Sequence, residues 1–354
     1  MYRIPINNNE SSSCKPKGLY DSMLRFEGKK SNFVHFLLIC VIIYNIVALL
    51  LPYETSTTFK KYIILINCVT CTSQLIWLIL LRSKRCEYIE LVNLFERQSG
   101  LSLENPLVYR HFAKIRNSFL FYIVTINAIV AFFNFRSCII IFQQSDDFVQ
   151  SLKASLFNLM LLLPVLGFQL FNQFLVESSL YIHGCWLIVN EQIVSLRNID
   201  WRMLTSDKVR EIRSMYSIAS ETTERMDSFL RLPILNFYSY AIISGHIYLA
   251  EIIYNPSIVS FIILVFRFLI IALIAYNMIY IHYLSNKCFH DIYVLSYEKH
   301  PFQVNNEIQM FLDRIGQSNV GFSFLKISLI TSTFVTSLAS LTLSFALSVP
   351  TFFS

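Results

Sequence analysis

The chain alternates between long apolar blocks and shorter polar stretches. Each apolar block holds about 20 residues, the length that an α-helix needs to cross a lipid bilayer. The pattern therefore predicts an all-α, polytopic membrane protein with seven transmembrane helices and a polar N-terminal tail over residues 1–32. The predicted spans are about 33–51, 62–81, 119–142, 152–176, 234–254, 258–283 and 322–349.

The polar segments between the blocks also carry helical periodicity. The stretch 87–100, EYIELVNLFERQSG, predicts an amphipathic surface helix that stops at Gly100. Beyond span four the helical pattern continues over 180–200, and a second helix over 205–232 runs into span five. We therefore expect two long helices that stand off the membrane and are continuous with spans four and five.

The last apolar block, 319–349, has one polar face. Its polar side chains recur at steps of three, four or seven, which places them on one side of a helix. They are Lys326, Thr333, Ser337, Ser340, Ser344 and Ser348. Such a face either packs closely on another helix or lines water, and the spacing alone leaves both readings open.

Composition supports the membrane assignment and gives no sign of catalysis. The chain is 55% hydrophobic and 15% charged, whereas soluble domains average about 25% charged residues. Cys68 and Cys71 form a C-x-x-C without a second pair or a nearby histidine, so we predict neither a metal site nor a cofactor. The sequence has no P-loop, G-x-S-x-G or H-E-x-x-H motif and no intramembrane carboxylate pair, which predicts a protein that is not an enzyme.

The distribution of Lys and Arg predicts the orientation. Twenty-three of them lie before span one or in the loops after spans two, four and six, whereas the alternate loops hold Lys60, Lys61 and Lys153. The positive-inside rule then makes the N-terminus cytoplasmic and the C-terminus extracellular. The net charge of +6 comes from these loops and is no sign of nucleic-acid binding. This orientation disfavours a metabotropic seven-helix receptor, and the odd span count disfavours a transporter.

Ionisable residues inside the spans are candidates for a ligand pocket. Arg267 lies near the membrane midplane, where a charged side chain costs about 2.5–3.5 kcal/mol and should face a partner or water. Arg136 lies in the outer half of span three, and His246 and Glu251 lie in the outer half of span five. All four can converge on one cavity, with Glu251 as the nearby acid. Alternatively, Arg136 snorkels outward and Glu251 sits at the membrane surface.

Two stretches resemble the insect gustatory-receptor superfamily, together with its odorant-receptor and nematode relatives. One is the helix 209–240, and the other runs from Asn319-Val320-Gly321-Phe322 to Thr336. The family's last span carries Thr-Tyr, an apolar run and then Gln-Phe. Thr336 matches, Ser337 replaces the Tyr, and Ser344-Phe345 lies one residue late. The chain thus resembles a divergent member, and its hydroxyl-rich ending looks more like the nematode branch.

The resemblance implies a chemosensory, gustatory-type receptor that is a ligand-gated cation channel. Such proteins are tetramers whose last helices surround the pore, which here assigns the lining to Thr333, Ser337, Ser340 and Ser344. The helices 177–233 and 285–315 would form a cytoplasmic anchor between subunits. The implied partners are a small-molecule ligand, permeant cations, membrane lipid and related receptor subunits, in the plasma membrane of sensory neurons. A light- or peroxide-responsive member of the same family is the alternative.

Overall fold

The computed structural model describes residues 58–144, 162–199, 203–254, 258–317 and 319–353, with parts of 36–46 and 148–152. The helices are α3 (Thr58–Ser83), α4 (Arg85–Ser99), α5 (Pro106–Gln144), α7 (Leu162–Arg197), α8 (Ser206–Tyr254), α9 (Ile258–Leu295), α10 (Phe302–Gln317) and α11 (Ser332–Phe353). Strands β1 (Ser323–Phe324) and β2 (Ser328–Leu329) form an antiparallel hairpin. The predicted tail 1–32, about half of span one and residues 153–161 of span four lie outside the described residues.

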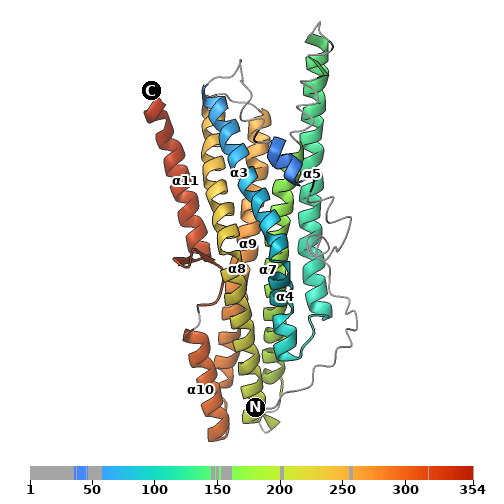
Figure 1. Cartoon of the computed structure of the whole chain (residues 1–354). Helices are drawn as coiled ribbons and strands as arrows, with labels where there is room; N and C mark the ends of the chain where they lie inside the picture. The colour runs from blue at the N-terminus through green and yellow to red at the C-terminus, as the bar shows by residue number, and fades with distance from the viewer. Residues whose placement is uncertain are drawn as a thin grey trace.

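The helices stand side by side in an elongated bundle with α7 at its centre (Figure 1). Helix α7 packs against α3, α5, α8 and α9, and its side chains Phe171, Phe174 and Trp186 are completely buried. At one end of the bundle α10 packs on α8 and α9, whereas at the other end α11 packs on α8 (Figure 1). The hydrophobic core is therefore continuous along the axis of the bundle, and α11 packs on it mainly through α8.

Helix α8 runs without a break for 49 residues, which corresponds to about 74 Å. It joins the predicted stem helix 205–232 to the apolar stretch 234–254, with Pro233 inside the helix. Its N-terminus is capped by Thr205, whose Oγ1 accepts a hydrogen bond from the Lys208 N–H at 3.4 Å. One rigid element thus links the two ends of the bundle.

Helix α4 has the form that the pattern over 87–100 predicts. Its apolar face, which includes Tyr88, Leu91 and Phe95, is buried against the bundle. The helix ends at Gly100 with φ of 71°, where the Gly100 N–H donates to the Glu96 carbonyl oxygen at 3.0 Å. A residue without a Cβ adopts this left-handed conformation at little cost, so Gly100 terminates the helix.

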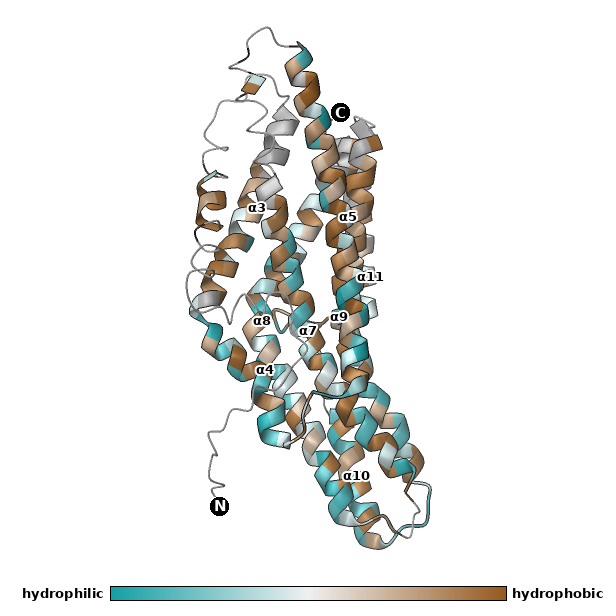
Figure 2. Cartoon of the chain, turned by 90° about the vertical axis from the view of Figure 1, so that its right-hand side faces the viewer, coloured by the Kyte–Doolittle hydropathy of each residue, from teal (hydrophilic) through white to brown (hydrophobic). Residues whose placement is uncertain are grey.

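The surface is apolar along one half of the bundle and polar along the other (Figure 2). Large apolar side chains such as Phe121 and Phe132 of α5 and Phe261 and Leu269 of α9 are exposed. Exposed apolar bands of this kind are those of a helical membrane protein. Within the described residues, two helical stretches, Pro106–Ile140 and Phe261–Leu295, are long and apolar enough to span a membrane. Seven spans therefore stay a prediction.

The last helix is shorter than the sequence predicts. Residues 323–329 form the β1–β2 hairpin, with Ser323 opposite Leu329, and α11 begins only at Ser332. Leu325 and Lys326 have φ of 56° and 60°, a left-handed conformation that a right-handed helix excludes. The prediction of a helix over 322–349 is wrong for residues 322–331, and Lys326 does not share a helix face with the hydroxyls.

The polar segment 285–315 is also divided. Helix α9 carries it as far as Leu295, a turn follows, and α10 begins after Pro301. The His300 imidazole closes the turn through a 3.1 Å hydrogen bond between Nε2 and the Leu295 carbonyl oxygen. Because Pro301 lacks an N–H and restricts the residue before it, the two helices cannot fuse into one.

Candidate functional site

Helix α11 has a packing face and a separate hydroxyl face. Phe334, Val335 and Leu338 are partly buried and Thr342 is buried. The Phe334 ring meets the Tyr238 ring of α8 edge-on, with centroids 5.8 Å apart. The predicted pore-lining residues lie elsewhere on the helix and are all exposed in the single chain: Thr333, Ser337, Ser340 and Ser344. Packing within the chain therefore does not use these hydroxyls.

The family-motif residues are structural parts of the hairpin and the helix start. Phe322 is completely buried. A Cβ on Gly321 would lie 3.1 Å from Leu329 Cδ1 and 3.4 Å from His282 Cβ, so the hairpin closes tightly on α9 there. The exposed Thr336 donates its hydroxyl to the Thr333 carbonyl oxygen at 3.0 Å. These positions fix how the chain enters α11.

The hairpin is tied to α8 by the buried carboxylate of Asp227. The Ser323 N–H donates to Asp227 Oδ1 and the Ser323 hydroxyl donates to Oδ2, each at 2.6 Å. Burial raises the pKa of Asp227 above its usual range, although both bonds from Ser323 act in the opposite direction. On the other side the Val320 carbonyl oxygen accepts from His282 at 3.1 Å and from Ser285 at 3.3 Å. The segment before α11 is thus clamped to α8 and α9.

Arg267 lies between two aromatic rings. Its guanidinium carbon is 5.0 Å from the Tyr240 ring centroid and 5.3 Å from that of Phe168, and its Nη1 is enclosed. The Cys71 thiol and the Tyr122 hydroxyl lie within electrostatic reach. A guanidinium over a ring in a desolvated setting gains about 2 kcal/mol, which helps to offset the burial of this charge. Arg267 therefore belongs to a polar and aromatic layer inside the bundle.

The predicted convergence of four ionisable residues on one cavity fails at Arg136. Tyr122 donates its hydroxyl to the Phe266 carbonyl oxygen at 3.3 Å and so marks the level of Arg267 on α5. Arg136 is exposed and lies about 21 Å further along that helix. His246 lies about 9 Å beyond Tyr240 on α8, and its Nδ1 bonds to the Ile242 carbonyl oxygen at 2.6 Å. The Glu251 side chain lies outside the described residues. The expectation is wrong for Arg136 because helix rise separates it from Arg267.

A row of buried polar side chains on α7 was missed by the sequence reading. Asn127 of α5 donates its amide to Gln169 Oε1 at 2.6 Å, and the Gln173 amide donates to the buried Glu177 carboxylate. The side-chain amides of Asn172 and of Gln74 on α3 have no hydrogen-bond partner among the described residues. The signal was present, since polar residues recur three or four positions apart in the stretch FQLFNQFLVESS. They make the interior of the bundle polar near Arg267.

The buried His183 and the half-buried His111 form a second polar group between α5, α7 and α9. His111 Nε2 lies 3.0 Å from His183 Nδ1, and His183 Nε2 lies 2.7 Å from the Asn277 carbonyl oxygen. A carbonyl can only accept, so His183 Nε2 carries the proton and its Nδ1 accepts from His111. Burial, with a smaller contribution from the neighbouring His111, lowers the pKa of His183 to about 3, although the bond to Asn277 acts in the opposite direction. The neutral pair is therefore the stable state.

Acid is expected to destabilise the protein through His183. Its pKa is about 3 in the folded state and about 6.5 in an unfolded chain, so the unfolded state binds more protons between these values. Stability is then full above about pH 6.5 and falls by about 1.4 kcal/mol per pH unit below it. In detergent, the unfolding temperature of His183→Gln should fall less steeply with decreasing pH below about 6.5 than that of the wild type. The exposed His290→Gln serves as the control, and equal slopes in all three proteins would contradict this assignment.

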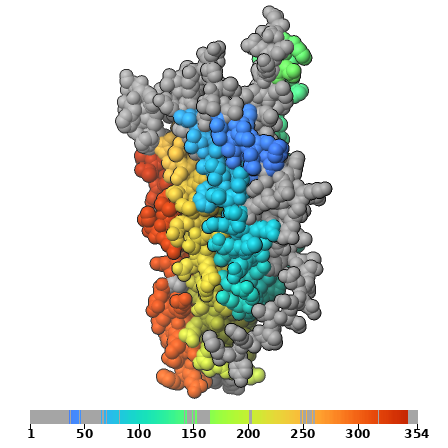
Figure 3. All heavy atoms as spheres, in the orientation of Figure 1, coloured from blue at the N-terminus to red at the C-terminus, as the bar shows by residue number. Residues whose placement is uncertain are grey.

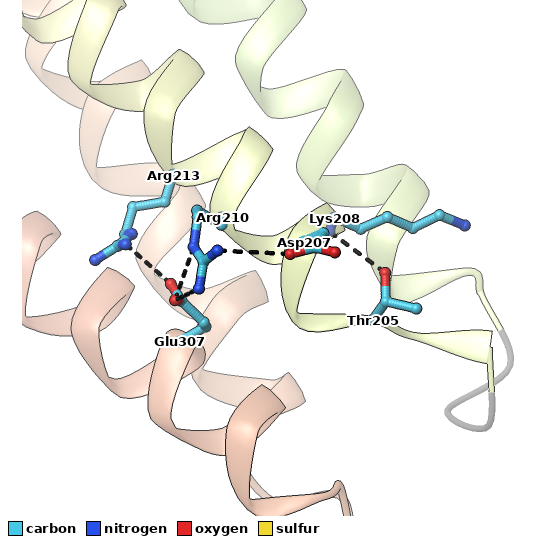
Figure 4. Close-up of polar contacts among 6 residues, drawn as sticks. All are labelled: Thr205, Asp207, Lys208, Arg210, Arg213 and Glu307. Carbon is cyan, nitrogen blue, oxygen red and sulfur yellow. Dashed lines mark hydrogen bonds and ion pairs between the residues drawn. The ribbon is translucent and has the colours of Figure 1, made fainter.

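An ion cluster joins α10 to α8 (Figure 4). Glu307 of α10 is buried, and its carboxylate oxygens lie 2.7 Å from Arg210 Nη2 and 2.9 Å from Arg213 Nη2. Arg210 also contacts Asp207 at 3.5 Å. The side chains of Arg210 and Arg213 are 59% and 27% exposed, so their guanidinium groups stay partly hydrated while the Glu307 carboxylate is buried. It holds α10 in place below the hairpin.

Comparison with known proteins places the fold. No protein-family model and no curated protein sequence matches the chain. Its structure is similar to that of the insect olfactory receptor OR5 from Machilis hrabei, with a TM-score of 0.56 and 11% identity over 98% of this chain and 93% of that one. The eugenol complex of the same receptor gives a TM-score of 0.53 at 11% identity, covering 98% and 92% of the two chains. At this identity the likeness shows the fold alone: the chain has the fold of this olfactory receptor.

Proposed function

From the insect olfactory-receptor fold of this chain, we propose that it is a chemosensory receptor, of gustatory type, that acts as a ligand-gated cation channel in the plasma membrane. Four subunits surround one pore, and α11 of each subunit lines it. The observation that carries this proposal is the hydroxyl face of α11, which stays exposed while the opposite face packs on α8. Lipid is a poor environment for such a face, whereas hydroxyls facing a pore replace part of the water shell of a passing cation.

The proposed orientation follows from the Lys and Arg distribution. The chain crosses the membrane seven times, with the N-terminus in the cytoplasm and the C-terminus outside. The polar half of the bundle, with α4, α10 and the adjoining halves of α7, α8 and α9, then lies in the cytoplasm. The ion cluster on Glu307 and the Asp227 tether both belong to this half. It acts as the anchor that holds the entry to α11.

The proposed ligand is a small organic molecule that enters the bundle from outside. The similar olfactory receptor has been solved in complex with eugenol, which is such a molecule. In this chain the layer around Arg267 offers a guanidinium between two aromatic rings, close to the buried row on α7. We assign Arg267 to the ligand pocket, with His246 and Glu251 above it. A ligand with an oxygen acceptor and an apolar body suits this layer.

Patch recording in cells without endogenous ligand-gated channels tests the proposal. Cells that express the chain, alone or with a related receptor, should carry a cation current when a mixture of small volatile and soluble compounds is applied. The current should persist in excised patches without GTP, because the pore belongs to the receptor itself. A response that needs GTP would instead support a metabotropic receptor, and a response to light or peroxide alone would favour the other branch of the family.

Cysteine substitution along α11 is expected to give a periodic pattern of block. Thr333→Cys, Ser337→Cys, Ser340→Cys and Ser344→Cys should each lose current when a charged, membrane-impermeant thiol reagent is applied during ligand-evoked opening. Val335→Cys and Leu338→Cys are the matched controls, since these side chains face α8 and should not react. Block of the controls but not of the hydroxyl positions would place the pore elsewhere.

A further inference from the structure

A groove of about 520 Å³ lies between α8 and the corner where α3 passes into α4. The two segments run alongside α8 on one face of the molecule, so the groove opens at the surface (Figure 3). Its lining comes from Trp77, Leu81, Lys84, Glu87, Glu90, Leu91, Leu94, Arg225, Ser228, Phe229 and Leu232. It lies apart from the Arg267 layer and from the α11 face, and neither the ligand pocket nor the pore uses it.

The lining changes from apolar to charged along the bundle axis. One end holds Trp77 and Leu81 of α3 with Phe229 and Leu232 of α8. About one to two helical turns further along both walls come Lys84 and Arg225, and another turn beyond Lys84 come Glu87 and Glu90. In the proposed orientation, on which this inference rests, the apolar end meets the inner leaflet and the charged end faces the cytoplasm. Beyond the apolar end the exposed charges therefore come in the order cationic, then anionic, and the buried Leu91 and Leu94 of α4 lie past them.

The groove is lined by two cationic and two anionic side chains, and one of each sign is free to contact a ligand. Arg225 pairs with Glu221 at 2.6 Å, and Glu90 pairs with Arg97 at 3.4 Å. Within the described part of the chain, no ion pair engages the side chain of Lys84 or Glu87, and both are exposed. A cation and an anion about one helical turn apart match a ligand that carries a negative and a positive group in sequence.

We propose that the groove binds a zwitterionic glycerophospholipid, with a phosphocholine or phosphoethanolamine headgroup, from the inner leaflet. The acyl chains lie against Leu81 and Leu232, the phosphate meets Lys84, and the ammonium meets Glu87. This order follows the lipid itself, whose phosphate is next to the glycerol and whose ammonium is outermost. Phosphatidylglycerol has no ammonium, so Glu87 would face its headgroup without a positive partner and disfavour it.

Native mass spectrometry of the full-length protein in equimolar phosphatidylcholine and phosphatidylglycerol nanodiscs tests this assignment. Wild type should retain phosphatidylcholine at about one lipid per subunit and with about tenfold preference. Glu87→Lys should reverse the preference toward phosphatidylglycerol, because the anionic end becomes cationic. Ser228→Trp should displace the lipid by filling the groove, whereas Ser195→Trp, an exposed serine on α7, should leave it bound. Retention that is unchanged by Glu87→Lys and Ser228→Trp overturns the proposal.

Two further arms identify the source of the headgroup and separate this proposal from the channel. Short-chain phosphatidylcholine should compete for the groove, and free phosphocholine should not; equal competition would make it a site for a soluble ligand and overturn the lipid assignment. The mass measurement does not depend on current. Phosphatidylcholine retained without ligand-evoked current refutes the channel alone, whereas current with no lipid preference refutes the groove alone.

Discussion

An Asp227→Ala variant is expected to lose about nine-tenths of its ligand-evoked current while still reaching the cell surface. Both carboxylate oxygens of Asp227 hold Ser323, one through the backbone N–H and one through the hydroxyl. Hydrogen bonds to a charged group contribute about 1.5–3 kcal/mol each. If opening moves α11 relative to α8, loss of about 1.4 kcal/mol from this tether changes the gating equilibrium about tenfold. Whole-cell current normalised to surface protein measures the effect.

Milder changes at the same contact separate coupling from folding. Asp227→Asn keeps an acceptor for the Ser323 N–H and should retain intermediate current. Ser323→Ala removes the hydroxyl bond to Asp227, together with the bond that this hydroxyl accepts from the Lys326 N–H within the hairpin, and keeps the backbone bond to Asp227. In the Asp227→Ala background it should therefore add little to the loss of current. Glu224→Ala, an exposed carboxylate one turn earlier on α8, is the control and should behave as wild type. If the effects of Asp227→Ala and Ser323→Ala on the current are additive, the two residues act independently and the proposed tether is wrong.

Loss of both arginines around Glu307 is expected to destabilise the protein far more than loss of Glu307 itself. Arg210→Ala with Arg213→Ala leaves a buried carboxylate without a counter-charge, and such a group typically costs about 3–5 kcal/mol. Glu307→Gln leaves two guanidinium groups that are partly exposed and stay hydrated, so its cost should be about 1 kcal/mol. Thermal unfolding of the purified protein should show this order.

The matched control for the cluster is a surface pair. Arg97 and Glu90 lie 3.4 Å apart with side chains 66% and 61% exposed, so Arg97→Ala should cost less than about 1 kcal/mol. If the double arginine variant unfolds at the same temperature as Arg97→Ala, the Glu307 cluster does not hold α10 to α8. Restoring stability by adding Glu307→Leu to the double variant would confirm that the stranded carboxylate is the cause.

Local features were predictable wherever one strong signal dominated. Gly100 ends α4 because a left-handed residue was required and glycine supplies it. The long stem helices followed from apolar periodicity that continues beyond the spans, and α8 passes through residue 233 without interruption. The proline does not stop the helix because packing along both sides of α8 outweighs the missing hydrogen bond.

Features that depend on contacts far apart in sequence were not predictable. The hairpin 323–329 lies in a stretch whose polar residues follow helical spacing, so the local pattern predicts a helix. The contact that favours the hairpin instead is made with Asp227, which is 96 residues away in the sequence. The position of Arg136 relative to Arg267 depends on how far α5 rises, which needs the register of α5 against α9. The buried polar row on α7 lies inside a predicted span, where the sequence does not tell which face meets the bundle.

Because α8 is uninterrupted, insertions and deletions within it would change its contacts with α11. Asp227 holds the hairpin, Tyr238 meets Phe334, and Gly245 faces Thr342, so one side of α8 contacts the hairpin and α11 along its length. Asp227 and Gly245 are about five helical turns apart and therefore point the same way. One inserted or deleted residue between them would rotate the two contacts by about 100° relative to each other. Keeping the attachment of α11 therefore requires the length of this stretch to stay constant, in addition to the residues at these three contacts.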